Sequence, residues 1–255
     1  MNFKTINVKY QSPICYVQIH RPEANNTIND VLVEECLDLL GQCESRKGEE
    51  EITLVVWEGL PEVFCFGADF QAMSHNRIAN GPERLYELWL KMATGPFVTI
   101  SHVRGKVNAG GVGFVAASDI VLSDDTAQFS LSELLFGLFP ACVLPFLIRR
   151  IGFQKAHYLT LMTQPIEIKE ALRIGLVDVY DEQSESLLRK HLLRLRRLNK
   201  AGIARYKRYL NQIDPSLSEL KDLAVSANLE IFSDPANIKG IVDFVQKGIF
   251  PWQKD

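Results

Sequence analysis

Two short loops of small residues could place backbone amides against a ligand oxygen. The first, FCFGADF, spans residues 64–70, and the second, GKVNAGG, spans residues 105–111. Glycine and alanine allow the backbone to approach a ligand closely. Two N–H groups aimed at one carbonyl oxygen form an oxyanion hole, in which each donor stabilises a transition state by roughly 3–4 kcal/mol. Taken singly, either loop is better explained as a plain tight turn.

A glutamate further along the chain is a candidate proton-transfer group. Glu133 is the only carboxylate between Asp125 and Glu167, and the residues around it are strongly apolar. Burial disfavours the ionised form and raises a carboxyl pKa, which suits a group that exchanges protons near neutrality. The alternative is a surface glutamate that stabilises the first turn of a helix through the helix dipole.

The second loop also leads into a dinucleotide-binding pattern. Residues 111–116 read G-x-G-x-x-A between a strand-like and a helix-like segment, and Glu133 follows at about the spacing of a ribose-binding acid. A nicotinamide-dependent oxidoreductase is therefore a competing interpretation. Against it, the pattern lies in the middle of the chain rather than at the first βα turn, and few strand-like segments follow.

The elements that must position these residues alternate between strand and helix in the first half of the chain. Strand patterns occupy 13–20, 52–57, 97–101 and 119–123. One helix begins at Asn29 or Asp30 and another at Pro82. Beyond about residue 154 helices dominate, with 176–180 as a late strand and a helix beginning at Asp234. This alternation predicts one α/β domain with a helical C-terminal extension.

The composition is that of an ordinary globular protein. Of its 255 residues 47% are hydrophobic and 23% are charged, and the net charge is −3 with a pI near 6.0. Such a chain has no overall attraction to nucleic acid or to anionic membranes. The first residues lack the apolar core of a secretory signal, and the five cysteines include no Cys-x-x-Cys pair. We expect a cytoplasmic protein without a membrane segment, a disulfide framework or a bound metal.

Several motifs taken together resemble the crotonase (enoyl-CoA hydratase/isomerase) superfamily. They are HRP before ANN at residues 20–26, the GAD and GG turns, SDI at 118–120 and QFSLSE at 128–133. The resemblance covers nearly the whole chain. It implies a crotonase-like ββα spiral core over residues 1–190 and a helical C-terminal trimerisation region over residues 191–255. A homotrimer or hexamer would follow.

The same resemblance assigns roles to individual residues. The backbone amides of Ala68 and Gly110 would hold a thioester oxygen, and Glu133 would exchange protons with the substrate. Asn108 is a candidate for orienting a hydroxyl group, although an asparagine in a glycine loop can equally make a turn. Neighbouring residues expected to contact the substrate are Phe66, Asp69, Phe70, Gly111 and Tyr86.

One position departs from the pattern of simple hydratases. Those enzymes usually carry two catalytic glutamates, whereas here Gly113 stands in the place of the first. A Gly113→Glu change would restore the second carboxylate if the pocket has room for it. Longer stretches, among them RPEANNTIND, TISHVRGKVNAGG and FPACVLPFLIRRIG, resemble the dehydratases of polyketide β-branching clusters.

That narrower resemblance implies a particular reaction. The enzyme would remove water from a 3-hydroxy-3-methylglutaryl group carried on the phosphopantetheine arm of an acyl carrier protein, without a further cofactor. A second crotonase would then decarboxylate the 3-methylglutaconyl product. Decarboxylation needs an oxyanion hole but no base for an α-proton, so retention of Glu133 favours the dehydratase of the pair. Decarboxylase or isomerase activity stays open, as does an RNA-binding crotonase-like protein.

Positive charges could serve the carrier protein and the substrate. Residues 189–208 hold nine Lys and Arg and no acid. Such a run is typical of a solvated helix face, and it could also dock an acidic carrier protein. Nucleic acid is the less favoured partner. For the free carboxylate of the substrate, the cations nearest in the chain to the glycine loops are Arg84, Lys91 and Lys106.

Overall fold

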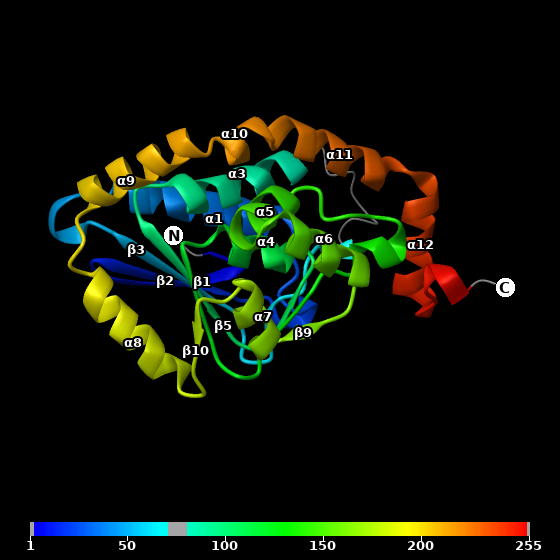
Figure 1. The fold of residues 1–255 in the computed structure, drawn as a ribbon, viewed down its shortest axis with the longest axis horizontal. Coiled ribbons are helices and arrows are strands. Elements are labelled where there is room, and N and C mark those ends of the chain that lie inside the picture. The colour runs from blue at the N-terminus through cyan, green and yellow to red at the C-terminus, as the bar shows by residue number, and fades with distance from the viewer. Residues whose placement is uncertain (1–2, 71–80, 254–255) are drawn as a thin grey trace.

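Two sheets and a cover of helices form the computed structural model, which describes residues 3–70 and 81–253 (Figure 1). The larger sheet has the strand order β1-β2-β3-β5-β7-β10. Strands β1 and β2 pair antiparallel, and all the later neighbours pair parallel. These strands are β1 (Ile6–Gln11), β2 (Ile14–Ile19), β3 (Leu54–Glu58), β5 (Val98–Val103), β7 (Ile120–Ser123) and β10 (Val179–Tyr180).

A smaller sheet has the order β4-β6-β8-β9. Its strands are β4 (Val63–Cys65), β6 (Lys106–Asn108), β8 (Gln128–Ser130) and β9 (Ile166–Glu167). In chain order β4, β6 and β8 each follow directly after a strand of the larger sheet, and a helix comes after each pair. This succession is the predicted ββα spiral. The short strands of the smaller sheet were not predicted, because three residues are too few to show an alternating pattern.

Two helices of the core, α1 (Asp30–Ser45) and α3 (Gly81–Thr94), begin within one residue of the predicted starts at Asp30 and Pro82. The core contains further helices, which are α4 (Gly110–Ala117), α5 (Leu144–Ile151), α6 (Phe153–Met162) and α7 (Ile168–Ile174). Short 3-10 turns are η1 (Pro22–Ala24), η2 (Gly48–Glu50), η3 (Glu133–Phe136) and η4 (Pro251–Gln253). The Asn29 side chain accepts a hydrogen bond of 2.9 Å from the Leu32 N–H and so caps α1 as predicted.

Five further helices form the C-terminal part. They are α8 (Ser184–Leu195), α9 (Lys200–Ile213), α10 (Ser216–Glu219), α11 (Lys221–Ser233) and α12 (Pro235–Lys247). Helix α12 begins at the predicted Asp-Pro pair, with the Asp234 side chain accepting from the Ala236 N–H at 2.8 Å. None of the helices in the described part of the chain is long and apolar enough to cross a membrane.

Both faces of the larger sheet are buried along its central strands β3 and β5. Along β3, Val55 and Trp57 pack into the main core with α1, α3 and α4, whereas Leu54 and Val56 face a second cluster with Leu187, Leu188, Leu192 and Ile203. Side chains of a strand alternate between its faces, so one strand serves both clusters. Helices α8 and α9 therefore cover the sheet of their own chain. The expected domain boundary at residue 190 falls inside α8, and the trimer stays a prediction.

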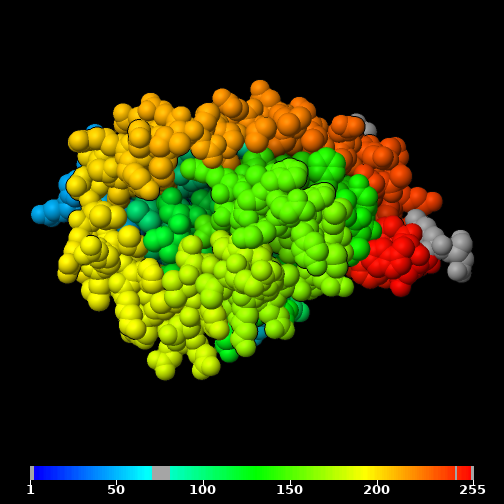
Figure 2. All heavy atoms as spheres, in the orientation of Figure 1, coloured from blue at the N-terminus to red at the C-terminus, as the bar shows by residue number. Residues whose placement is uncertain are grey.

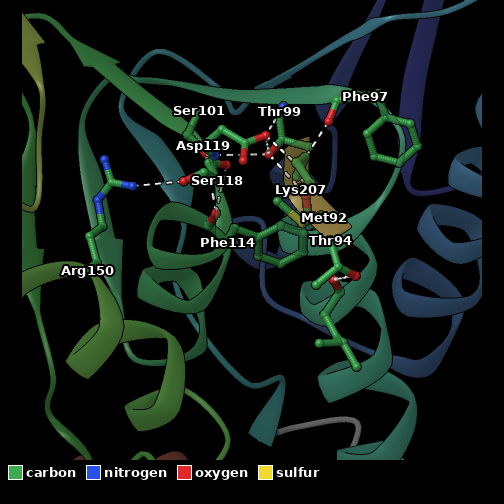
Figure 3. A network of polar contacts seen from close by, with 11 residues as sticks. Met92, Thr94, Phe97, Thr99, Ser101, Phe114, Ser118, Asp119, Arg150 and Lys207 are labelled. Carbon is green, nitrogen blue, oxygen red and sulfur yellow. Dashed lines mark hydrogen bonds and ion pairs between the residues drawn. The ribbon is translucent and has the colours of Figure 1, made fainter. Parts of the chain in front are cut away.

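Two lysines of the basic run are structural. Lys207 on α9 is buried, and its Nζ donates to Asp119 Oδ2 at 2.8 Å and to the carbonyls of Met92 and Phe97 at 3.1 and 3.0 Å (Figure 3). Burial lowers the pKa of Lys207, and nearby Asp119 opposes that shift. Lys200 likewise donates to the carbonyls at the end of α1. For these two residues the expectation of a solvated face is wrong.

The other seven cations of the run are exposed. They are Arg189, Lys190, Arg194, Arg196, Arg197, Arg205 and Arg208. Helices α8 and α9 lie at one end of the long axis and α12 at the other (Figure 1). Figure 2 shows the molecule hollowed between α8 and α9, away from the C-terminal end.

We predict that Lys207→Ala lowers the free energy of unfolding by roughly 3 kcal/mol, because it leaves a half-buried carboxylate and two carbonyls without their cation. The neighbouring exposed Arg208→Ala should change it by less than about 0.5 kcal/mol. Urea denaturation followed by circular dichroism measures both. Equal losses in the two variants would show that the Lys207 contacts do not stabilise the fold.

Candidate active site

A largely apolar cavity lies where the starts of α1, α3 and α4 converge. Residues 139–143 and helix α11 supply further walls. Ala68, Gly110 and Glu133, which are far apart in the sequence, all line this cavity. The structure thus brings together the two predicted amide donors and the predicted proton-transfer group.

The two glycine loops touch each other. Gly67 has a φ of +88°, and a Cβ at that position would lie 2.7 Å from the Cβ of Ala109. Ala109 itself has a φ of +51°, a conformation that costs a non-glycine residue energy and is typical of functional sites. At Gly111 a Cβ would lie 2.2 Å from the Cys65 carbonyl oxygen. Small residues are therefore required for the loops to approach this closely.

The amides of Ala68 and Gly110 are left free by the surrounding hydrogen bonds. The first loop is fixed to the chain before α1, since the Ile28 N–H donates to the Gly67 carbonyl at 2.7 Å and the Asp69 N–H donates to the Ile28 carbonyl at 3.0 Å. Gly110 is the first residue of α4, where backbone N–H groups lack partners within the helix. Within the described part of the chain, neither N–H donates to another protein group.

Glu133 has a carboxyl oxygen that is buried and without a partner among the described residues. It opens η3, directly after the loop that follows β8. Its Oε2 atom is buried and has no hydrogen-bond partner among the described residues. Burial raises the pKa of Glu133 to about 7, because desolvation penalises the charged form. The alternative of a surface glutamate is excluded.

Asn108 does not line the cavity but joins the two loops beside it. The Ser130 hydroxyl donates to Asn108 Oδ1 at 2.8 Å, and Asn108 Nδ2 donates to the Ser132 hydroxyl at 3.0 Å. Ser132 directly precedes Glu133, the first residue of η3. The side-chain amide of Asn108 therefore holds the start of η3 against β6, the strand that leads to Gly110. With both ends of its amide engaged, Asn108 positions the site rather than a substrate hydroxyl.

Among the other predicted substrate contacts only Phe70 lines the cavity. Phe66 is 41% exposed outside it. Asp69 pairs with Arg21 at 2.8 Å, which fixes the first loop. Tyr86 is fully buried, and its hydroxyl donates to the Leu217 carbonyl at 2.6 Å. Asp69, Tyr86 and Gly111 therefore shape the site by packing, and neither they nor Phe66 line the cavity.

Trp89 is a lining residue that the sequence did not single out. A Cβ at Gly113 would lie 2.3 Å from Cζ2 of its ring. The space where a second glutamate would extend is thus filled by indole, and the expectation that Gly113→Glu could restore this carboxylate is wrong. The dinucleotide interpretation fails for the same reason, since Gly111 and Gly113 both face packed protein atoms. Only the tertiary contact reveals this pairing.

Polar groups in the wall are few. Side-chain oxygen or nitrogen atoms come from Asn29, Asp30, Trp89, Glu133 and Asn228, and no Lys or Arg is among the described lining residues. The candidate cations lie elsewhere, since Arg84 pairs with Glu34 and Glu87 and Lys91 pairs with Glu44. Lys106 is exposed on β6 and does not line the cavity either.

A separate group of Glu58, His102 and Glu185 has metal-ligating atoms within 4.8 Å of one another. Both ring nitrogens of His102 are engaged, one with Glu58 at 2.7 Å and the other with the Ser184 hydroxyl at 2.9 Å. The guanidinium of Arg104 lies between the two carboxylates, at 3.7 Å from Glu58 and 3.3 Å from Glu185. This arrangement is a closed ion-pair network.

The chain belongs to the enoyl-CoA hydratase/isomerase family, whose profile matches residues 9–255. It is 60% identical, over 99% of its own length and 98% of its relative's, to the bacillaene synthase dehydratase PksH of Bacillus subtilis. The family and this dehydratase confirm the predicted hydro-lyase type of enzyme.

Solved structures agree with this assignment. A crystal structure described as a polyketide biosynthesis enoyl-CoA hydratase of Bacillus subtilis matches with a TM-score of 0.93 and 61% identity, and covers 98% of this chain and 100% of that one. An enoyl-CoA hydratase structure from Mycobacterium avium paratuberculosis, with a TM-score of 0.86, 98% and 99% coverage and 20% identity, shares the fold. The predicted crotonase-like fold is thereby confirmed.

The raised pKa of Glu133 links its protonation to stability. The native state binds this proton more tightly than the unfolded chain, so the free energy of unfolding should fall as the pH rises from about 4.5 to 7. We predict that between pH 4 and pH 8 the wild type loses on the order of 3 kcal/mol relative to Glu133→Gln. Denaturant titrations at both pH values measure this difference, with the exposed Glu182→Gln as a control that should follow the wild type.

Proposed function

We propose that this protein is a dehydratase of polyketide biosynthesis that converts 3-hydroxy-3-methylglutaryl-acyl carrier protein to the 3-methylglutaconyl thioester. One observation carries the proposal. Among the described residues, a carboxyl group with one unpartnered oxygen and a pKa of about 7 shares an apolar cavity with two backbone amides that donate to no other protein group. The 60% identical relative, named a bacillaene synthase dehydratase, supports the direction of the reaction and its setting.

The amides act on the thioester carbonyl. Its oxygen accepts hydrogen bonds from the N–H groups of Ala68 and Gly110, and Gly110 also presents the positive end of α4. As the α-proton leaves, negative charge develops on this oxygen, and the two preorganised donors stabilise it. The apolar wall strengthens these interactions because it excludes water.

Glu133 then moves one proton. Its carboxylate removes the α-proton, which leaves a carboxylic acid beside an enolate. The enolate re-forms the carbonyl and expels the β-hydroxyl as the new C=C bond forms, and the proton held by Glu133 passes to the departing oxygen to give water. A pKa near neutrality suits both halves of this transfer. Because one carboxyl serves both atoms, the elimination is syn.

The position of Trp89 explains why one carboxyl must suffice. Its ring fills the space beside Gly113, so the described lining offers Glu133 and, at the start of α1, Asp30 as carboxylates. Asp30 lies in the first turn of α1, behind the Asn29 cap. A decarboxylase would need no base, and an isomerase would need a second proton-transfer site. The geometry therefore favours neither the decarboxylase nor the isomerase alternative.

The carrier protein would deliver the substrate on its phosphopantetheine arm. Helix α11 and the start of α3 form the cavity wall, whereas the exposed cations of α8 and α9 lie toward the opposite end of the molecule from α12 (Figure 1). Docking of an acidic carrier on that basic face of the same subunit is therefore not favoured. A homotrimer, and a partner crotonase that decarboxylates the product, remain part of the proposal.

Asn228 on α11 is the group we assign to the substrate's free carboxylate. Asp30 is an acid and Glu133 is the base, which leaves the amides of Asn29 and Asn228, and the cap of α1 fixes the Asn29 amide in place. The amide of Asn228 offers two N–H donors and forms no hydrogen bond within the described residues. A neutral donor can bind a carboxylate without a cation in the wall.

We expect the protein to convert 3-hydroxy-3-methylglutaryl-carrier protein to a product lighter by one water, as read by intact-mass spectrometry. Glu133→Gln should reduce turnover by at least roughly a hundredfold while the circular dichroism spectrum stays unchanged, because the amide cannot accept the proton. In the wild type, kcat/KM should fall below a pH of about 7, since dehydration starts from the carboxylate. Wild-type turnover in the variant would remove Glu133 from the mechanism, and absence of water loss in the wild type would overturn the proposal.

For Asn228→Asp we expect KM for the carboxylate-bearing substrate to rise at least roughly tenfold, because two like charges would meet in a site of low dielectric. KM for the 3-hydroxy-3-methylbutyryl thioester, which lacks that carboxylate, should change little. Ser226→Asp adds the same charge at an exposed position of the same helix and is the matched control. Equal effects of Asn228→Asp on both substrates would place the carboxylate elsewhere.

A further inference from the structure

Buried polar atoms without partners point to a second substrate contact. Among the described residues such side-chain atoms occur in Thr53, Trp57, Trp89, Glu133 and Asn211. Only Trp89 and Glu133 belong to the cavity lining. Native proteins pair nearly all buried polar groups, so an unpaired one beside a cavity indicates a ligand atom that completes it.

The indole of Trp89 is held rigidly. The Gly113 backbone lies against its six-membered ring. Phe114 and Phe146 pack on it edge-on, with ring centroids at 6.1 and 5.9 Å. Trp89 is fully buried. Such a ring cannot turn its N–H toward solvent, and leaving a buried donor unpaired costs about 1–3 kcal/mol.

The two unpaired groups are chemically complementary. Indole is a donor only, whereas an ionised carboxylate is an acceptor only. A hydroxyl group satisfies the first through its oxygen and can approach the second through its proton. A β-hydroxyacyl thioester held by the Ala68 and Gly110 amides carries such a hydroxyl on the carbon that lies two bonds from the carbonyl carbon.

We propose that the indole N–H of Trp89 donates a hydrogen bond to the β-hydroxyl oxygen of the substrate and stabilises it as it leaves. The inference rests on the proposed function and deepens it. When the C–O bond breaks, its electron pair stays on the oxygen, and the proton that makes water comes from the Glu133 carboxylic acid. Trp89 keeps its own proton throughout. Its hydrogen bond strengthens as negative charge develops on the departing oxygen.

Trp57 provides a matched control in the same chain. Its indole N–H is also buried and unpaired. It packs on the same Phe114 ring, with centroids 5.6 Å apart. Trp57 does not line the cavity. Trp57→Phe and Trp89→Phe therefore remove the same donor from the same core, and only the second should affect the substrate's hydroxyl.

The test compares binding of two pantetheine thioesters by isothermal titration calorimetry. One carries 3-hydroxy-3-methylglutarate and the other 3-methylglutarate, which lacks the hydroxyl, and Glu133→Gln is the background that prevents turnover. The Glu133→Gln protein, with or without Trp57→Phe, should bind the hydroxylated ligand roughly three- to tenfold more tightly than the ligand without the hydroxyl. Trp89→Phe should abolish this preference. The ratio of the two affinities is taken for each variant separately, so a general loss of packing that weakens both ligands equally does not change it.

In the otherwise wild-type enzyme, Trp89→Phe should lower kcat for water loss roughly ten- to a hundredfold, whereas Trp57→Phe should stay within about twofold. An unchanged hydroxyl preference in Trp89→Phe, or an equal loss in both variants, would overturn the inference and leave the dehydratase proposal intact. A wild type that binds the hydroxylated thioester but releases no water would instead defeat the proposed function. The calorimetric comparison would still decide the Trp89 contact.

Discussion

The contact between the two glycine loops is the constraint on which the site depends. Gly67 lies against Ala109, and Gly111 lies against the Cys65 carbonyl, at distances that leave no room for a larger side chain. The smaller sheet produces this contact, because β4 and β6 are parallel neighbours and both loops follow from their ends. Two amides are thereby fixed side by side before any substrate arrives, which is the preorganisation that makes an oxyanion hole effective.

Around this contact the protein keeps polar groups unpaired inside an apolar wall. The Glu133 carboxyl, one oxygen of which is buried without a partner among the described residues, costs stability when it ionises, and the backbone of Ala109 is strained. Ion pairs and hydrogen bonds outside the cavity offset these costs. Arg21 with Asp69 fixes the first loop, and Asn108 fixes the segment before Glu133. Asp69 and Asn108, which the sequence suggested as substrate contacts, thus hold the loops of the site in place and do not contact the substrate themselves.

The C-terminal helices serve the core as well as the cavity. Helix α9 is anchored by Lys207 inside the protein, and α11 brings Asn228 and Phe232 into the cavity wall. Helix α12 packs on η3, the turn that begins with Glu133. Specificity and catalysis therefore draw on residues from both halves of the chain. A description of this region as an oligomerisation module alone would omit these intrachain roles.

The sequence by itself predicted five strands of the larger sheet and the starts of α1, α3 and α12, and its resemblance to the crotonase superfamily implied the ββα spiral and the roles of Ala68, Gly110 and Glu133. Local signals carried the strand and helix predictions, namely alternating apolar residues and the helix caps at Asn29 and Asp234. The tertiary structure alone decided which further side chains face the cavity. Trp89 meets Gly113 across twenty-four positions of the chain, and no local pattern records that packing. Likewise, the partners of Asp69, Tyr86 and Lys207 lie dozens of residues away, and burial depends on which surfaces meet when the chain has folded.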